Sequence, residues 1–306
     1  QQQEDSIQAH ETLVETLLNV LTNAPDAEAF QSAWQRVSKH FDTLLTTEHS
    51  VDKLKETILQ LAVMGKLVPQ DPNDEPASVL LEKIADEKEQ LIKDGKIKRK
   101  RRPTLDDNLA VPFKLPIGWA LSNLSDIGHD WGQKKPDKKF TYIDVGSINK
   151  ELGVIEEQNV LDKDEAPSRA RKIVKYGTVI YSTVRPYLLN IAVVDRDFTP
   201  EPIASTAFAI IHPFKGMEPS YIYSYLRSPI FVSYVESCQT GIAYPAINDK
   251  QFFSGIIAVP PLAEQHRIVA KVDELMALCD DLKQSLNDAQ TTQMQLTDAV
   301  TEQAVN

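Results

Sequence analysis

Cysteine is scarce in this chain of 306 residues, since only Cys238 and Cys279 are present. Two cysteines exclude a disulfide framework and a cysteine-rich metal site, and they favour a reducing, cytoplasmic location. The longest apolar runs are far shorter than the roughly 20 residues that a membrane-spanning helix needs, so we expect no membrane contact. The first residues show no charged segment followed by an apolar one, which argues against a signal peptide.

Sequence motifs of catalysis are absent as well. There is no Gly-x-x-x-x-Gly-Lys-Ser/Thr loop for nucleotide phosphates, no Gly-x-Gly-x-x-Gly motif and no Gly-x-Ser-x-Gly nucleophile elbow. The six histidines include no pair at ligand spacing on one helix face, so no zinc site is expected. Cys238 has no obvious partner base and is better explained as a small buried hydrophobe. We therefore expect no catalytic residue and no metal site.

The net charge of −11 is unevenly distributed along the chain. Residues 1–92 carry a net charge of −10 and residues 261–306 carry −5, whereas residues 93–102 carry +6 and residues 134–190 carry +3. Negative charge thus lies mainly on the expected helical segments, and positive charge lies in the middle. A negative total does not exclude a local basic face that binds nucleic acid.

The N-terminal part shows helical periodicity. Residues 5–66 are expected to be helical, with a break near residues 23–26. A turn at residues 71–76 follows, and Ser78 then has the character of an N-cap for a helix that runs through Ile92.

The C-terminal part is expected to form one long helix. No Gly or Pro occurs after Leu262, which predicts a helix roughly 65 Å long at ~1.5 Å per residue. Apolar positions recur at steps of four and three residues, which is typical of a narrow coiled-coil seam that packs against another helix. This seam consists of Ile268, Val272, Leu275, Cys279, Leu282, Leu286, Ala289, Leu296 and Val300.

Between the two helical parts the periodicity changes. Short β-type runs, each bounded by Gly, Pro, Asn or Asp, occur at residues 117–119, 142–145, 178–181, 189–194 and 207–211. One or two helices are expected between residues 220 and 237. The predicted fold class is α+β, with a globular mixed α/β domain between an N-terminal helical region and a long C-terminal coiled-coil helix. The predicted boundaries are 1–92 for the helical region, 93–114 for a basic, charged linker, 115–259 for the mixed domain and 260–306 for the long helix.

Four groups of residues in the mixed domain suit contact with nucleic acid. Lys and Arg in loops bind phosphates, whereas Arg, Asn, Ser and Thr can read base edges. Any one group is equally explained as solvated surface charge, and composition alone leaves this choice open. The candidates are Lys134, Lys135, Lys138, Lys139, Arg169, Arg171, Lys172, Ser182, Thr183, Arg185, Tyr187, Tyr244, Asn248 and Lys250.

Five segments in order resemble the DNA-specificity subunit of type I restriction–modification enzymes. They are residues 115–119, 177–188, 203–208, 241–247 and 260–269, and residues 54–70 also match segments of that family. Members usually carry two target recognition domains, each followed by a long conserved helix. This chain has room for one of each and so resembles a half subunit; a natural half subunit and a fragment of a two-domain subunit both remain open. The first 50 residues match no motif of the family.

The resemblance implies a non-catalytic role in a larger complex. Each recognition domain would read one half of a split double-stranded DNA site. The paired long helices would set the gap between the halves and dock the methyltransferase subunits. Methylation with S-adenosylmethionine and cleavage with ATP and Mg would belong to the methyltransferase and restriction subunits, so no cofactor is expected on this chain.

The resemblance also suggests roles for single residues. Phosphate anchors would be Lys134, Lys138, Arg169 and Lys172, and candidates for sequence readout are Ser182, Thr183, Arg185, Tyr187, Tyr244 and Asn248. A half subunit can rebuild the two-domain arrangement as a homodimer through residues 268–300, or its tail helix can fold against its own N-terminal helices. The alternative to DNA recognition is a coiled-coil scaffold whose central domain binds protein.

Overall fold

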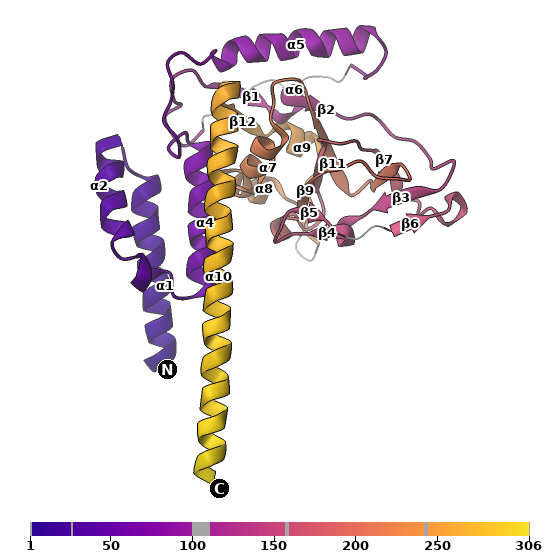
Figure 1. Ribbon diagram of the computed structural model, residues 1–306. Helices are drawn as coiled ribbons and strands as arrows, with labels where there is room; N and C mark the ends of the chain where they lie inside the picture. The colour runs from indigo at the N-terminus through magenta and orange to yellow at the C-terminus, as the bar shows by residue number, and fades with distance from the viewer. Residues whose placement is uncertain (1, 26, 100–110, 157–158, 242–243, 306) are drawn as a thin grey trace. The chain divides into compact units, whose positions relative to one another are not determined.

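The structure is a computed structural model that describes residues 2–25, 27–99, 111–156, 159–241 and 244–305 (Figure 1). It has the predicted fold class, with mixed helices and strands, helices at the N-terminal end and a long C-terminal helix. The chain forms two compact units. We call Gln1–Ala62 with Ala270–Asn306 the helical unit, and Val63–Val269 the mixed unit. Across the described ranges, no helix combines the length and apolarity needed to cross a membrane.

The helical unit contains α1 (Gln2–Thr22), α2 (Ala27–Ser38), α3 (Phe41–Leu44), α4 (Glu48–Val63) and most of α10 (Leu262–Val305). The predicted break near residues 23–26 is confirmed, and two further breaks separate α2, α3 and α4. The last break is stabilised locally, because Thr47 and Ser50 each donate a backbone N–H to the other's hydroxyl at 3.1 Å. The core of this unit comprises Val14, Leu18, Leu21, Ala33, Val37, Leu44 and Leu45.

The long C-terminal helix is confirmed as one uninterrupted element of 44 residues. Its seam is buried at Ile268, Val272 and Cys279, is half-buried at Leu275, Leu282 and Leu286, and is exposed at Ala289 and Leu296. The side chain of Val300 lies outside the described residues. Leu282 packs on the core of the helical unit, so this part of the tail folds against the chain's own N-terminal helices.

Ion pairs accompany this packing between α4 and α10. Lys55 pairs with Asp280, and Lys283 lies 3.1 Å from a carboxylate oxygen of Asp52 and 3.5 Å from one of Glu48. These pairs are partly exposed, so each contributes at most about 1 kcal/mol. The apolar seam therefore supplies most of the stability of this contact, and the charges favour one register.

The mixed unit is built on two four-stranded sheets that share a core. One sheet has the order β6 (Asn159–Leu161), β3 (Phe140–Ile143), β10 (Pro202–Ser205) and β7 (Ala170–Ile173), in which β3 and β10 are parallel. The other has the order β2 (Gly128–His129), β11 (Phe208–Pro213), β8 (Val179–Ser182) and β9 (Ile191–Val193), all antiparallel. Both contribute to one buried cluster that includes Ile143, Ala204, Ile180, Ala192, Phe208 and Ile210.

Smaller elements complete the mixed unit. Strands β1 (Ala120–Asn123) and β12 (Ile256–Val259) pair with each other, as do β4 (Ile148–Asn149) and β5 (Val154–Ile155). The helices are α5 (Ala77–Lys93), α6 (Leu124–Ile127), α7 (Pro219–Arg227), α8 (Pro229–Cys238) and α9 (Asp249–Ser254). Short 3-10 turns lie at Val145–Ser147, Lys163–Glu165 and Pro186–Leu188. One or two helices were expected between residues 220 and 237, and the structure has two, α7 and α8.

Two local predictions are wrong. The run at residues 117–119 is no strand, because Gly118 has a φ of 82° in a turn and β1 begins only at Ala120. Ser78 is not the N-cap of α5; Pro76 holds that position and Ser78 lies in the first turn. Residues 63–92 belong to the mixed unit, and the domain boundaries drawn from the sequence stay a prediction. Half of the predicted linker, residues 100–110, lies outside the described residues.

Candidate nucleic-acid interface

Two loops of the mixed unit lie side by side, one after β8 and one before α9. Val184 and Ala246 form an antiparallel β-bridge between them. The backbone N–H of Arg185 donates to the carbonyl oxygen of Pro245 at 2.8 Å. Backbone bonds fix these loops to each other, so their exposed side chains are held in a common arrangement rather than moving independently.

Arg185 is the most constrained exposed residue of this loop pair. Its φ of 48° is in the left-handed region, which costs a non-glycine residue roughly 1–2 kcal/mol. The hydrogen bond to Pro245 and the 3-10 turn Pro186–Leu188 hold it there. Its guanidinium carbon lies 5.2 Å from the ring centre of Tyr244, within reach of a cation–π contact. Backbone strain of this kind is often found at binding sites.

The aromatic residues of the loop pair are also exposed. Tyr187 is 50% exposed and Tyr244 is 69% exposed. An exposed tyrosine presents a flat apolar face with a hydroxyl at its end, which suits contact with sugar or base edges. Arg185 and these two tyrosines therefore form a small surface that combines a positive charge with aromatic rings.

A turn between β10 and β11 connects this surface to a basic strand. The backbone N–H and the hydroxyl of Thr183 both donate to the carbonyl oxygen of Ala207 at 2.9 Å. Thr206, which precedes Ala207, donates its N–H to the carbonyl oxygen of Arg169 at 2.8 Å. Arg169 has an exposed side chain, whereas the guanidinium of Arg171 is half-buried and donates to the carbonyl oxygen of Ala170 at 2.9 Å.

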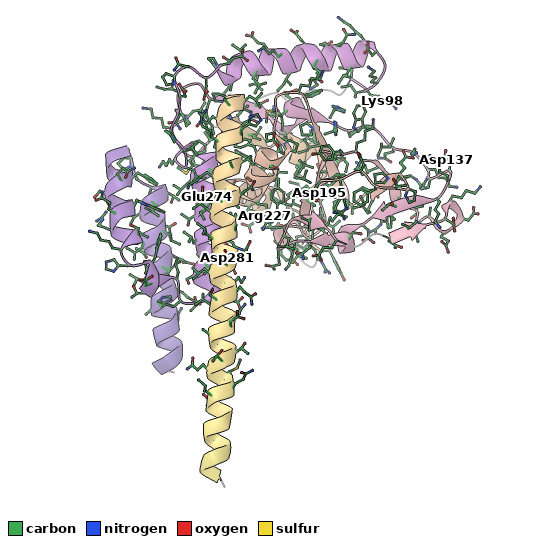
Figure 2. All side chains as sticks on the ribbon, in the orientation of Figure 1. Lys98, Asp137, Asp195, Arg227, Glu274 and Asp281 are labelled. Carbon is green, nitrogen blue, oxygen red and sulfur yellow. The ribbon has the colours of Figure 1, made fainter. Side chains whose placement is uncertain are left out.

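The lysine loop before β3 begins beside β7. The N–H of Lys134 donates to the carbonyl oxygen of Arg171 at 2.9 Å. The ammonium group of Lys134 lies 2.6 Å from a carboxylate oxygen of Glu201, and that of Lys138 lies 4.0 Å from the same atom. Lys135 and Lys139 have exposed side chains. Figure 2 labels Asp137, which marks this loop at one end of the mixed unit, near β3 and β7.

Three candidates have structural roles that limit contact with a ligand. Ser182 is 2% exposed and its hydroxyl donates to the carbonyl oxygen of Val184. Lys172 is 8% exposed, and its ammonium group lies 3.6 Å from a carboxylate oxygen of Asp249. Asn248 caps α9, because its side-chain oxygen accepts the N–H of Gln251 at 2.9 Å. These side chains hold the loops in place, while Lys250, at the first turn of α9, is exposed.

The structure thus brings residues from all four predicted groups into one connected region. Sequence reasoning missed its acidic members, Glu201 and Asp249. Nothing local marks them, because Glu201 lies 67 residues from the lysine that it pairs with. Only the pairing of strands places these carboxylates beside the basic residues. They partly neutralise Lys134 and Lys172. The exposed basic side chains among the described residues of this region include Arg169, Arg185, Lys135, Lys139 and Lys250.

An aromatic cluster beside β2 and β11 was also missed. The rings of His129, Trp131 and His212 lie within 5.3 Å of one another, and the ammonium group of Lys175 lies 3.7 Å from the Trp131 ring centre. Burial, together with the nearby His129 and Lys175, lowers the pKa of His212 to about 4. Both histidines are therefore neutral at pH 7 and act as packing groups, which agrees with the partner Thr178, whose hydroxyl lies 2.9 Å from His212.

No metal site emerges from the part of the chain that the structure describes, since no group of three or more His, Cys, Asp or Glu side chains there could hold a metal ion.

Residues 116–289 match the model of the type I restriction modification DNA specificity domain. The chain belongs to this family. The resemblance inferred from the sequence is thereby confirmed.

Relatives and solved structures agree with this assignment. The whole chain aligns with the EcoAI and EcoEI specificity subunits of type I restriction enzymes from Escherichia coli, at 38% and 36% identity. It covers 53% and 54% of those proteins, so it spans about half their length. The HsdS subunit of Thermoanaerobacter tengcongensis matches 60% of this chain and 49% of its own, with 34% identity and a TM-score of 0.55. A structure of a type I R-M system, described for its assembly and conformational transition, matches 62% of this chain and 50% of its own, with 34% identity and a TM-score of 0.58.

Proposed function

We propose that this chain recognises one half of a bipartite double-stranded DNA site as part of a type I restriction–modification specificity subunit. The observation that carries the proposal is the exposed pair of Arg185 and Tyr244, held in a strained but firmly bonded pair of loops. Membership in the specificity family and the names of the Escherichia coli relatives support the same function.

The proposed contacts follow from the chemistry of the exposed groups. Arg185 has the planar fork that binds guanine through two hydrogen bonds, and Tyr187 and Tyr244 offer flat faces for neighbouring groups in the groove. Arg169 and the exposed lysines of the loop before β3 would bind phosphates and set the register on the duplex. In this proposal the buried Lys172 supports the surface through Asp249 and does not itself bind a phosphate.

The larger complex is part of the proposal. Methyltransferase subunits would dock on the long helices, and restriction subunits would join them in the cytoplasm. S-adenosylmethionine, ATP and Mg would bind to those partners, and this chain would be the non-catalytic member. The exposed distal stretch of α10, where Met294 is 61% and Leu296 is 62% exposed, would pair with a second long helix, either from a second copy or from another part of a longer subunit.

The test begins by finding the target. The chain is co-expressed with its methyltransferase partner, and methylated adenines are mapped across the host genome. Fluorescence anisotropy then measures binding of a labelled duplex that carries the mapped site, at several salt concentrations. The slope of log affinity against log salt should be negative, with about −0.9 for each phosphate contact.

Substitutions of the loop pair make the test residue-specific. Arg185→Ala should lower affinity for the mapped site about 5- to 150-fold, as expected for loss of ~1–3 kcal/mol from a two-bond guanine contact. The matched control is Lys215→Ala, which removes an exposed positive charge at a residue whose N–H is bonded to Glu87 of α5. Equal, small effects of both substitutions would contradict the assignment of Arg185. A flat salt response of the unmodified chain would contradict DNA recognition itself and favour the protein-binding scaffold.

A further inference from the structure

Three segments far apart in the sequence meet around the first two turns of α10. They are residues 65–77, residues 116–119 and the start of the helix itself, and all belong to the mixed unit. The charged residue Glu264 is 1% exposed at this point and Gln265 is 0% exposed. A carboxylate and an amide buried side by side at a helix start need specific partners, because an unpaired buried polar group costs stability.

Glu264 has one partner from each of the other two segments. The indole N–H of Trp119 donates to Oε2 of Glu264 at 3.0 Å, and the amide of Gln70 donates to Oε1 at 3.1 Å. Gln70 also donates to the carbonyl oxygen of Gly65 at 2.6 Å, which ties its segment into the same network. Burial raises the pKa of Glu264, whereas the two hydrogen bonds and Arg267 oppose that shift and favour the carboxylate.

Gln265 binds the chain on another side of the helix. Its side-chain oxygen accepts the backbone N–H of Glu218 at 2.9 Å, and its amide donates to the carbonyl oxygens of Pro260 and Gly216 at 3.1 and 3.3 Å. Because successive side chains of a helix point about 100° apart, Glu264 and Gln265 hold the first turn from two directions.

Arg267 adds a third attachment one turn further on. Its guanidinium forms two contacts with the carboxylate of Asp74, at 2.6 and 3.4 Å. A paired geometry of this kind restrains orientation as well as distance. Apolar side chains of similar volume often stabilise a buried site as well as an ion pair does. Stability alone therefore does not explain a network with this many directional bonds. A need to hold the start of α10 in one defined geometry explains it better.

We propose that Glu264, Gln265 and Arg267 form a latch that fixes the direction in which α10 leaves the mixed unit, with Glu264 as its central positioning residue. This inference rests on the proposed function, in which the long helix sets the gap between two half sites. A change of ~10° at the latch would move a point 20 residues along the helix, ~30 Å away, by about 5 Å. That displacement exceeds the rise of ~3.4 Å per base pair along the axis of B-DNA. The latch would therefore determine how strictly one gap length is accepted.

The test compares gap selectivity in methylation. The complex is assembled from the full chain or from Glu264→Ala, and methylation is measured on duplexes with the mapped half sites and a gap changed by one base pair. We expect Glu264→Ala to raise methylation of the altered gaps at least tenfold relative to the normal gap, with the half-site sequences unchanged. The matched control is Glu274→Ala, which removes an exposed carboxylate of the same helix (Figure 2). Unchanged gap selectivity in a folded Glu264→Ala complex would overturn the latch, whereas an unmodified complex that accepts all gaps equally would overturn the proposed function as well.

A second variant covers the case in which Glu264→Ala does not fold. Trp119→Phe keeps an aromatic ring at this position and removes the indole N–H that donates to Glu264, together with the five-membered part of the indole. Spin labels on the exposed positions Lys163 and Asp288 then report the spread of distances between the mixed unit and the helix. We expect a broader distance distribution in Trp119→Phe than in Glu274→Ala. Distributions of equal width would overturn the latch without affecting the proposal of DNA recognition.

Discussion

Substitution of Gly65 by alanine offers a sharp test of the packing at the start of the mixed unit. Gly65 has a φ of 68°, and a Cβ atom there would lie 2.5 Å from Cγ of Pro116 and 3.0 Å from Cζ2 of Trp119. Gly95 has the same φ of 68° but no atom within 4 Å of an added Cβ. The two glycines share one backbone conformation and differ in their surroundings, so Gly95→Ala is the matched control.

The expected losses of stability follow from the backbone conformation, which both glycines share, and from steric overlap, which arises only at Gly65. At either position, alanine in the left-handed region costs roughly 1–2 kcal/mol, and the lower entropy of the unfolded chain offsets ~0.4–1 kcal/mol of this. At Gly65 the ring of Pro116 cannot yield as a flexible side chain would, so overpacking adds ~1–3 kcal/mol. We expect Gly95→Ala to lower the free energy of unfolding by about 1 kcal/mol and Gly65→Ala by about 2–4 kcal/mol.

Urea unfolding followed by tryptophan fluorescence measures both values. Trp119 adjoins Gly65 and reports on the mixed unit, and Trp34→Phe removes the indole of the helical unit in all variants, because two units need not unfold together. Equal losses for Gly65→Ala and Gly95→Ala would refute the steric argument and leave only the backbone term.

Two further predictions concern pH and the tail helix. Because the pKa of folded His212 is about 4, the unfolded state binds more protons between pH 6.5 and pH 4, and stability should fall by up to about 3 kcal/mol as the pH drops through that window. His212→Phe should flatten part of this slope in unfolding titrations, and an unchanged slope would contradict the neutral state of the half-buried His212. Leu282→Ala should destabilise the helical unit by about 1–3 kcal/mol, less than a full core substitution because Leu282 is only half-buried. Leu296→Ala, on the same seam but 62% exposed, should change the stability of dilute protein by less than about 0.5 kcal/mol. Similar losses for both leucines in chemical unfolding would contradict the packing of the seam.

The helices were predictable because their signal is local. In α2 the apolar residues recur at helical spacing, and Pro25 marks the break before it. The uninterrupted pattern after Leu262 likewise predicts α10 in full. Among the strands, β3, β8, β9 and β11 overlap the predicted β-type runs, because each is mainly apolar. Short strands such as β6 and β7 have no such run and depend on partners elsewhere in the chain.

The candidate interface was predictable only in part. Composition and resemblance located its basic and aromatic members, because exposed loops with Lys, Arg and Tyr have a recognisable character in the sequence. The sequence does not show which of these side chains are exposed and which are buried against a carboxylate. Lys172 and Lys135 have the same side chain, yet one is buried against Asp249 and the other is exposed.

By itself, the sequence determined the long helix, its apolar seam, the mixed character of the middle and the family. Each of these depends on spacing or on segments that can be recognised locally. Only the tertiary structure decided that Glu264 meets Trp119 and Gln70, that Arg185 is held over Tyr244, and that the seam is covered as far as Leu286 and exposed beyond it. The physical reason is that these contacts join residues distant in sequence, and long-range strand pairing and burial select them.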